Sequence, residues 1–351
     1  MGLSSRLRDP RDPLRHFIQS QLPHVDAIRR DMRERAPTMI FAPPDIERYL
    51  FSRIGWALDY RLRLYFAASS PFKTTALRGA VDMAQRPEIV KETAYVYDVM
   101  FNTSSGNLIW LPESERRLYV VDDSDALEEL SEKLQREGLV GGVALIPCGF
   151  AALGRAMIAE IELIAPLGRA LDVNAERRLC GLCYLLGHFE SARFHVEAIE
   201  SDRAIARIAN MKDVDEQLAL VPEDALEDVT AMSLRFAEAG GSLLGQNAIV
   251  DPHFPFGSEG WSVADADLVV GSTLIEIKTN RKLPTEIPFI YQLVGYLLAD
   301  ADDGYGITEV GWYLARYGAL VTWPVSEFLE KLAGSSVDPA EMRDRVLSVE
   351  W

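Results

Sequence analysis

The 351-residue chain has few cysteines and no long apolar segment, and both absences limit what it can be. With three cysteines, at least one thiol is unpaired, which favours a reducing compartment over a disulfide-stabilised secreted fold. The longest mainly apolar stretch, residues 140–166, is interrupted by Pro147 and by charged side chains, unlike a membrane span. The N-terminus lacks the apolar core of a signal peptide. These features predict a cytoplasmic protein with no membrane partner.

Basic charge is also scarce, because 36 Lys and Arg residues face 53 Asp and Glu residues for a net charge of −17. This excess of negative charge disfavours indiscriminate binding to nucleic acid. A nucleic-acid surface would have to be a local basic track, for which the candidates are the arginines of the first 35 residues, Arg61, Arg63, Arg281 and Lys282. The alternative for the N-terminal arginines is a set of solvated helix faces.

Two common catalytic signatures are missing, the GxxxxGK phosphate loop and the GxSxG nucleophile turn, so the sequence does not predict an ATPase, a helicase or a serine hydrolase of that kind. A zinc site is a weak alternative. Cys180 and Cys183 precede His188 and His195, but the cysteines lie three apart on an apolar helical segment. A free cysteine there behaves as a small buried hydrophobe.

What is present is a short apolar hairpin with charged residues. Residues 268–270 and 273–277 are rich in β-branched side chains and are separated by Gly271-Ser272, a pair suited to a type II′ turn. A two-residue loop would pair position i with position 543 − i, so Asp267 faces Glu276 and Asp265 faces Lys278. These four charged side chains would share one face. The opposite face would be apolar core, formed by Leu268, Val270, Ile275 and Ile277.

The paired carboxylates of this hairpin suggest metal chemistry. Opposed Cβ atoms lie about 5 Å apart, and two carboxylates at that distance repel unless a cation lies between them or one is protonated. A hard divalent ion with oxygen ligands meets that need, and a nearby lysine can reach a phosphate oxygen or a water. The alternative is an exposed strand face whose charges are solvated.

Three motifs together resemble the PD-(D/E)xK nuclease superfamily, in particular its RecB-like branch. Asp267, Glu276 and Lys278 match D…ExK, and Gln292 with Tyr296 matches the QxxxY element that follows it. Upstream, the segment from Gly55 to Asp59 reads GxxxD where that branch carries GxxxH or an acidic motif. The resemblance covers roughly residues 45–67 and 247–325.

The resemblance implies a Mg²⁺- or Mn²⁺-dependent deoxyribonuclease, with an exonuclease the first expectation, in DNA repair, recombination or defence against foreign DNA. It implies that Asp267 and Glu276 bind the metal, with Asp59 and the Ile277 backbone carbonyl as further candidate ligands. Lys278 would act on the attacking water, and Gln292 and Tyr296 would position the site. No iron–sulfur cluster is expected, because no cysteine follows Cys183.

Several alternatives stay open at this point. Asp265 could replace Asp267 if the hairpin register slips. Asp59 could be an ordinary surface carboxylate, and His188, which follows Gly187 on an apolar helical segment, could be a rival ligand or a core histidine. The whole protein could also be a catalytically silent nuclease-fold module that binds nucleic acid or protein.

The implied fold is α/β, a restriction-endonuclease-like mixed sheet flanked by helices, with a large and mostly helical insertion. We expect five segments. They are an arginine-rich lead-in over 1–40, a motif helix over 41–69, the insertion over 70–244, the nuclease core with its hairpin, QxxxY helix and C-terminal hairpin over 245–330, and a helical tail over 331–351. DNA is the expected partner, and the insertion is a candidate site for a protein partner.

Overall fold

The computed structural model describes residues 3–42, 50–67, 74–86, 88–102, 107–110, 118–121, 132, 136, 140–164, 172–194, 203–240, 243–250, 252–256, 262–300 and 303–347. It is a mixed α/β fold, as the sequence predicts at this coarse level. The aspartates at positions 122, 123 and 125 predict a helix that runs to Glu137, and this segment falls almost entirely outside the described residues. Within the described part of the chain, no helix is both long and apolar enough to cross a membrane.

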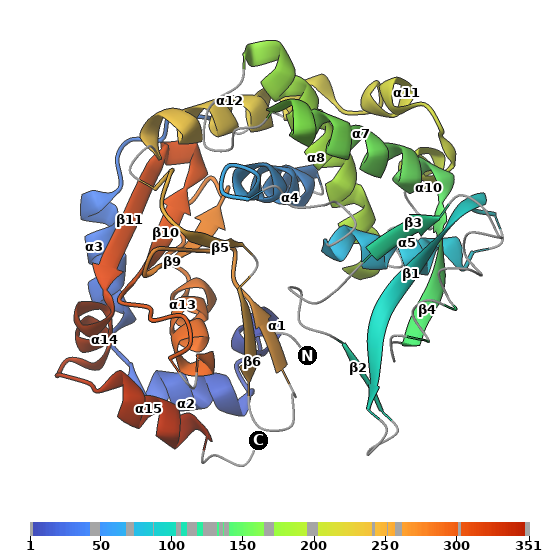
Figure 1. The fold of residues 1–351 in the computed structure, drawn as a ribbon. Helices are drawn as coiled ribbons and strands as arrows, with labels where there is room; N and C mark the ends of the chain where they lie inside the picture. Colours follow the sequence, from blue (N-terminus) through green and yellow to red (C-terminus); the bar gives the residue numbers. More distant parts are fainter. Residues whose placement is uncertain are drawn as a thin grey trace.

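A five-stranded mixed sheet lies in the half of the molecule that also holds α13, α14 and α15, with its strands in the order β11-β10-β9-β8-β5 (Figure 1). Only the β9–β10 pair is parallel, and the other three pairs are antiparallel. The strands are β5 (Ala248–Val250), β8 (Leu268–Val270), β9 (Thr273–Lys278), β10 (Glu309–Leu314) and β11 (Ala319–Pro324). The predicted catalytic and C-terminal hairpins are therefore both present, as β8–β9 and β10–β11.

The parallel β9–β10 pair needs a crossover, which helix α13 (Ile287–Ala299) supplies. Its sequence from Ile290 to Ala299 is buried throughout, so the helix packs closely on one face of the sheet. A two-stranded ribbon, β6 (His253–Phe256) with β7 (Ser262–Asp265), leads into the hairpin beside this helix.

Both faces of the five-stranded sheet are buried. Val269 and Leu274 pack with α13 and the terminal helices, whereas Leu268, Val270, Ile275 and Ile277 pack with helices of the middle of the chain. The four apolar residues predicted for one face are thus in the core. Helix α13 covers the face that carries Glu276, and this residue is buried. The alternative of an exposed strand face with solvated charges is therefore wrong for Glu276.

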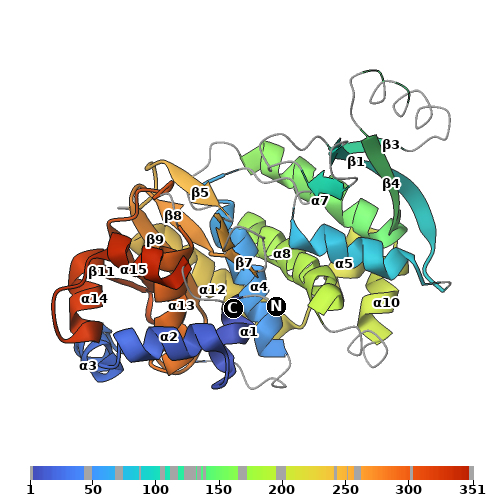
Figure 2. The ribbon, with the colours of Figure 1, turned by 90° about the horizontal axis from the view of Figure 1, so that it is seen from below.

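The N-terminal segment, expected as an arginine-rich lead-in, contributes apolar residues to the hydrophobic core. Helices α1 (Leu3–Arg8), α2 (Pro13–Gln21) and α3 (Val25–Arg35) share one hydrophobic cluster with α13 and with the C-terminal helices α14 (Val325–Ala333) and α15 (Pro339–Leu347). In Figure 2, α1 and α2 run beside α13. The apolar residues at helical spacing explain this packing, because Leu7, Leu14, Ile18 and Ile28 are all fully buried.

The middle of the chain holds helices and a second sheet. The helices are α4 (Leu50–Arg63), α5 (Thr75–Ala84), α7 (Cys148–Ile164), α8 (Val173–Phe194), α10 (Arg203–Asn210), α11 (Val214–Leu218) and α12 (Glu223–Ala239). The sheet is antiparallel and consists of β1 (Lys91–Asn102), β2 (Asn107–Trp110), β3 (Leu118–Val121) and β4 (Val140–Pro147). It lies at the far end of the molecule from α14 and α15 in both views (Figures 1 and 2).

Helices make up most of the described part of residues 70–244, as expected, but the sequence analysis did not predict this second sheet. The segment KETAYVYDVMFN of β1 is rich in β-branched and aromatic residues, which favour strands. Its pairing partners come from residues 107–110, 118–121 and 140–147. Strand β2 follows β1 as a local hairpin, whereas β3 and β4 pair with residues of β1 that lie tens of positions away, and pairing over that distance leaves no local signal.

Candidate active site

The β8–β9 hairpin has the predicted register. Leu268 pairs with Ile275, and Val270 pairs with Thr273, as the 543 − i rule requires. Gly271 has a φ of +60°, whereas Ser272, the second residue of the loop, does not have a positive φ. That is the first central position of a type II′ turn, which only glycine adopts without strain. Strand β8 begins at Leu268, so Asp267 stands just before the strand, next to the end of β9 that carries Glu276.

Glu276 and Lys278 share the sheet face that α13 covers, and they pair with each other. Lys278 Nζ donates to Glu276 Oε1 at 2.8 Å and to Gln292 Oε1 at 3.2 Å. The side chains of Lys278 and Glu276 are only 12% and 6% exposed, so this ion pair is largely screened from water. The QxxxY glutamine and the ExK lysine, which are 14 positions apart, therefore meet in one cluster.

Both polar atoms of the Gln292 side-chain amide form hydrogen bonds within the cluster. Its Oε1 accepts from Lys278, and its Nε2 donates to the Tyr296 hydroxyl at 2.8 Å. Tyr296 in turn donates to the Asp265 backbone carbonyl at 2.9 Å, which ties α13 to the end of β7. A four-residue spacing puts Gln292 and Tyr296 on one helix face, as predicted. The pair therefore positions Lys278 and the segment before Asp267.

Asp267 is held by the backbone of the opposite strand. Its Oδ2 accepts from the Ile277 amide at 2.6 Å. Because the N–H and C=O of a strand residue point to the same side of the strand, the Ile277 carbonyl is directed toward the edge where Asp267 lies. Asp265, which could have replaced Asp267 after a slip, has an exposed side chain and contributes its backbone carbonyl to Tyr296.

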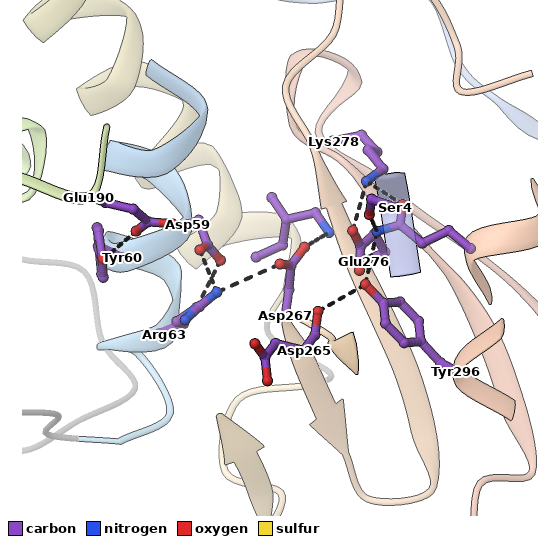
Figure 3. Close-up of polar contacts among 12 residues, drawn as sticks. Ser4, Asp59, Tyr60, Arg63, Glu190, Asp265, Asp267, Glu276, Lys278 and Tyr296 are labelled. Carbon is purple, nitrogen blue, oxygen red and sulfur yellow. Dashed lines mark hydrogen bonds and ion pairs between the residues drawn. The ribbon is translucent and has the colours of Figure 1, made fainter. Parts of the chain in front are cut away.

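Helix α4 brings Asp59 to the same end of the sheet. Arg63, one turn after Asp59, donates from Nε to Asp59 Oδ1 at 2.9 Å, and its second nitrogen lies 2.5 Å from Oδ2. The same guanidinium lies 3.6 Å from Asp267 Oδ1. Figure 3 shows that Arg63 contacts both carboxylates. Asp59 is thus close to the site, with an arginine interposed between it and the hairpin.

The glycine of the GxxxD motif allows this approach. A Cβ at Gly55 would lie 3.2 Å from the Thr279 hydroxyl oxygen, directly after the Lys278 end of β9. Thr279 is also fixed by Arg316, whose Nε donates to its carbonyl at 2.7 Å while the rest of the guanidinium binds Asp228. The end of β9 is therefore held by α4 on one side and by a buried ion pair on the other.

Burial changes the acidity of the carboxylates in the cluster. Desolvation, followed by the charge of Asp267, raises the pKa of Glu276 to about 7, although Lys278 opposes the shift. Desolvation also raises the pKa of Asp59 well above its ordinary range; Arg63 opposes this, and Asp267 and Glu190 add to it. Such raised values mark carboxylates that lack enough positive charge around them.

The residues present fit a divalent metal ion at Asp267 and Glu276. Glu276 is 5% exposed, and its Oε2 is buried with no hydrogen-bond partner. An unpartnered buried carboxylate oxygen is costly unless a cation or donor reaches it. Within the described residues, no three histidine, cysteine or carboxylate side chains are grouped closely enough to form a metal site alone. Mg²⁺ usually binds through one or two carboxylates, with other oxygens completing its shell, so the two carboxylates suffice.

Several other predicted candidates have different surroundings. Arg61 was a candidate for a substrate track, but it is 1% exposed and forms a two-pronged ion pair with Glu176 of α8. Arg6 is buried with Asp12, so it is neither a solvated charge nor part of an exposed track. Arg281 and Lys282 are exposed, as that role requires.

The alternative metal ligands of α8 belong to the core. Cys180 and Cys183 are fully buried, and desolvation raises the pKa of both thiols, which disfavours the thiolate form that binds zinc. The His188 ring packs edge-on against Tyr184 at 5.2 Å and is 5% exposed. His195, the last member of the zinc alternative, lies outside the described residues.

Sequence reasoning missed some participants. The role of Arg63 between Asp59 and Asp267 was not foreseen, although its four-residue distance from Asp59 was a signal for a helical ion pair. Glu190 accepts from the Tyr60 hydroxyl beside Asp59 and has no local sequence signal. Ser4 Oγ lies 3.2 Å from Gln292 Nε2, a contact across 288 positions that nothing in the local sequence indicates.

No protein family, curated protein or solved structure matches this chain. The interpretation of the site therefore depends on its own geometry and chemistry.

Proposed function

We propose that the protein is a divalent-metal-dependent nuclease that hydrolyses phosphodiester bonds of DNA. The observation that supports this most strongly is the convergence of Asp267, Glu276, Lys278 and Gln292 from a hairpin and the following helix. Two carboxylates, a lysine and a glutamine at one strand end combine metal ligands with a positive group for a phosphate. Repair, recombination and defence against foreign DNA remain the expected settings.

Asp267 and Glu276 would hold the metal ion, with the Ile277 carbonyl as a candidate third oxygen. When bound, a divalent ion would polarise the phosphoryl group and so ease attack by water. Lys278 would orient that water and offset the negative charge that builds on the phosphate oxygens. Gln292 keeps Lys278 in place through Oε1, and Tyr296 keeps Gln292 in place.

The reaction consumes one water for each bond cleaved. The water oxygen forms a bond to phosphorus as the bond from phosphorus to the leaving sugar oxygen breaks. One water proton passes to solvent through the site, and the leaving oxygen takes up a proton. The products are a phosphate monoester and a hydroxyl, so neither an oxidant nor a nucleotide cofactor is needed.

Incubation of the purified full-length chain with linear, nicked, circular and single-stranded DNA, with Mg²⁺ or Mn²⁺, tests this proposal. We expect cleavage of at least one substrate, loss of cleavage in EDTA, and loss in the Asp267→Asn variant. A chain that is folded but cleaves none of these substrates with either metal contradicts the proposal.

The second candidate function is a catalytically silent nuclease-fold module that binds nucleic acid or protein. The observation in its favour is Arg63, because a guanidinium beside Asp267 partly neutralises the carboxylate that should hold the metal. It predicts that the chain binds DNA equally well with and without a divalent ion. The three residues of the D…ExK pattern are nevertheless all present and grouped together, which favours the catalytic proposal.

A further inference from the structure

We propose that the Arg63 guanidinium occupies the position where a second metal ion would otherwise bind, so that the site takes one divalent ion. This inference rests on the proposed function. It also reassigns Asp59, which would anchor Arg63 and would not be a metal ligand.

The contacts of Arg63 support a fixed position for its charge. It forms a two-pronged pair with Asp59, at 2.9 Å from Nε and 2.5 Å from the second nitrogen. That second nitrogen also lies 3.6 Å from Asp267 Oδ1. The Arg63 side chain is 13% exposed, and a guanidinium does not give up its proton in proteins. A permanent positive charge therefore lies against both carboxylates.

The two oxygens of Asp267 face different partners. Oδ2 is turned to the Ile277 amide, on the hairpin side, and Oδ1 is turned to Arg63, on the α4 side. Two-metal sites hold their ions about 3.5–4 Å apart and need a carboxylate that bridges them. A second ion that bridged Asp267 and Asp59 would have to displace Arg63. On the other side, Glu276 Oε2 is buried and has no hydrogen-bond partner, so it offers a ligand atom for one ion.

The charge of the site also favours a single ion. Four carboxylates, those of Asp59, Glu190, Asp267 and Glu276, lie near two cations, Arg63 and Lys278, which leaves a net charge of minus two. One divalent ion would neutralise this charge. Two divalent ions would leave an excess of positive charge that one phosphodiester cannot neutralise.

A fixed guanidinium would serve the reaction as well as the charge balance. Arginine recognises phosphate oxygens through its planar fork of donors, and it stabilises charge that develops during phosphoryl transfer. At 3.6 Å its contact with Asp267 is loose compared with its pair to Asp59. Arg63 can therefore keep its anchor on Asp59 while it reaches a phosphate oxygen beside Asp267.

Counting Mn²⁺ ions bound to the full-length chain tests the inference, by electron paramagnetic resonance and by calorimetry. We expect one ion in the wild type, two in Arg63→Met, which frees Asp59 and Asp267, and one in Arg63→Lys, which keeps the charge. Arg207→Met is a matched control, because Arg207 is an exposed residue of α10, and it should bind one ion. Arg63→Met should also lower kcat about 100- to 1000-fold.

Removal of Arg63 could also unfold the chain, because it leaves carboxylates without a partner, so the double variant Arg63→Met/Asp59→Asn is measured in parallel. With the extra carboxylate neutralised, we expect it to fold and to bind one ion. Two ions in the wild type, or one in a folded Arg63→Met chain, would overturn the inference and leave the proposed nuclease standing. No ion in the wild type would overturn both.

Discussion

Glu276 is the residue whose burial is hardest to explain without a bound cation. It lies under α13 with one oxygen paired to Lys278 and the other without a hydrogen-bond partner. Desolvation raises its pKa to about 7, so near neutral pH the protein must either protonate this group or neutralise it. A bound metal ion would offset the cost of burying this carboxylate. A position with only a packing role would carry an apolar residue instead.

The first prediction concerns the stability of the metal-free chain. A raised folded-state pKa means that the favourable contribution of Glu276 is complete below its ordinary value of 4.5 and is lost as pH rises through about 7. Because the glutamine of Glu276→Gln does not titrate, the free energy of unfolding of this variant in EDTA should rise relative to that of the wild type by on the order of 2 kcal/mol between pH 5 and pH 8. Urea denaturation at both pH values measures the gain. A difference between the two proteins that does not change with pH would contradict this account.

At the scale of elements, the site depends on how α4 is attached to the rest of the fold. The attachment is a buried ion pair between Arg61 of α4 and Glu176 of α8, in which both side chains are at most 2% exposed. Tyr65 places its ring under the Arg61 guanidinium, and Ser233 of α12 also binds Glu176. Because α4 carries Asp59 and Arg63, this pair sets the position of both relative to the hairpin.

The second prediction follows from that ion pair. Arg61→Met leaves Glu176 buried without its cation and should lower the free energy of unfolding by about 3–5 kcal/mol. Arg61→Met/Glu176→Gln removes both charges and should recover a large part of that loss. Chemical denaturation of the two variants measures the difference. If the single variant is as stable as the double variant, the ion pair is not what attaches α4.

How well elements could be predicted depended on the range of their contacts. The β8–β9 hairpin, α13 and the β10–β11 hairpin have local signals, namely alternation, a glycine turn and helical spacing, and the structure has all three. In the sheet of β1 to β4, strands β3 and β4 pair with residues of β1 that lie tens of positions away, and the burial of α1 against α13 joins opposite ends of the chain. Periodicity in one sequence does not carry such long-range pairings.

The same limit applied to the site. Register and motif order grouped Asp267, Glu276, Lys278, Gln292 and Tyr296, and the structure places these residues together. That Arg63 stands between Asp59 and Asp267 depends on where α4 crosses the end of β9, which is a tertiary contact. Arg61, two positions away on the same helix, points into the core instead, and no composition argument separates these two arginines.

At the scale of the whole molecule, a chain with a net charge of −17 must approach a polyanion. The carboxylates of the site add to the repulsion, and the N-terminal Arg6 is buried and cannot offset it at the surface. Neutralisation of the site by a divalent ion should therefore control DNA binding, in addition to the chemical step.

The third prediction is that a divalent ion tightens DNA binding at least about tenfold, because bound metal removes repulsion at the point where the phosphate must enter. Fluorescence anisotropy of a labelled oligonucleotide in Ca²⁺ and in EDTA measures the effect without relying on cleavage. The Asp267→Asn/Glu276→Gln double variant should lose the difference. Equal affinity of the wild type in Ca²⁺ and in EDTA would favour the catalytically silent module.

The most direct test of the central claim is the single-turnover rate of DNA cleavage by Lys278→Met at saturating Mn²⁺, beside wild type and Lys331→Met. Lys331 belongs to α14 and pairs with Asp31, away from the hairpin, so it is a matched control for the loss of one lysine. We predict that Lys278→Met still binds Mn²⁺ and cleaves about 100- to 1000-fold more slowly, whereas Lys331→Met cleaves at the wild-type rate. Equal rates for all three proteins would contradict the assignment of this site as the active site.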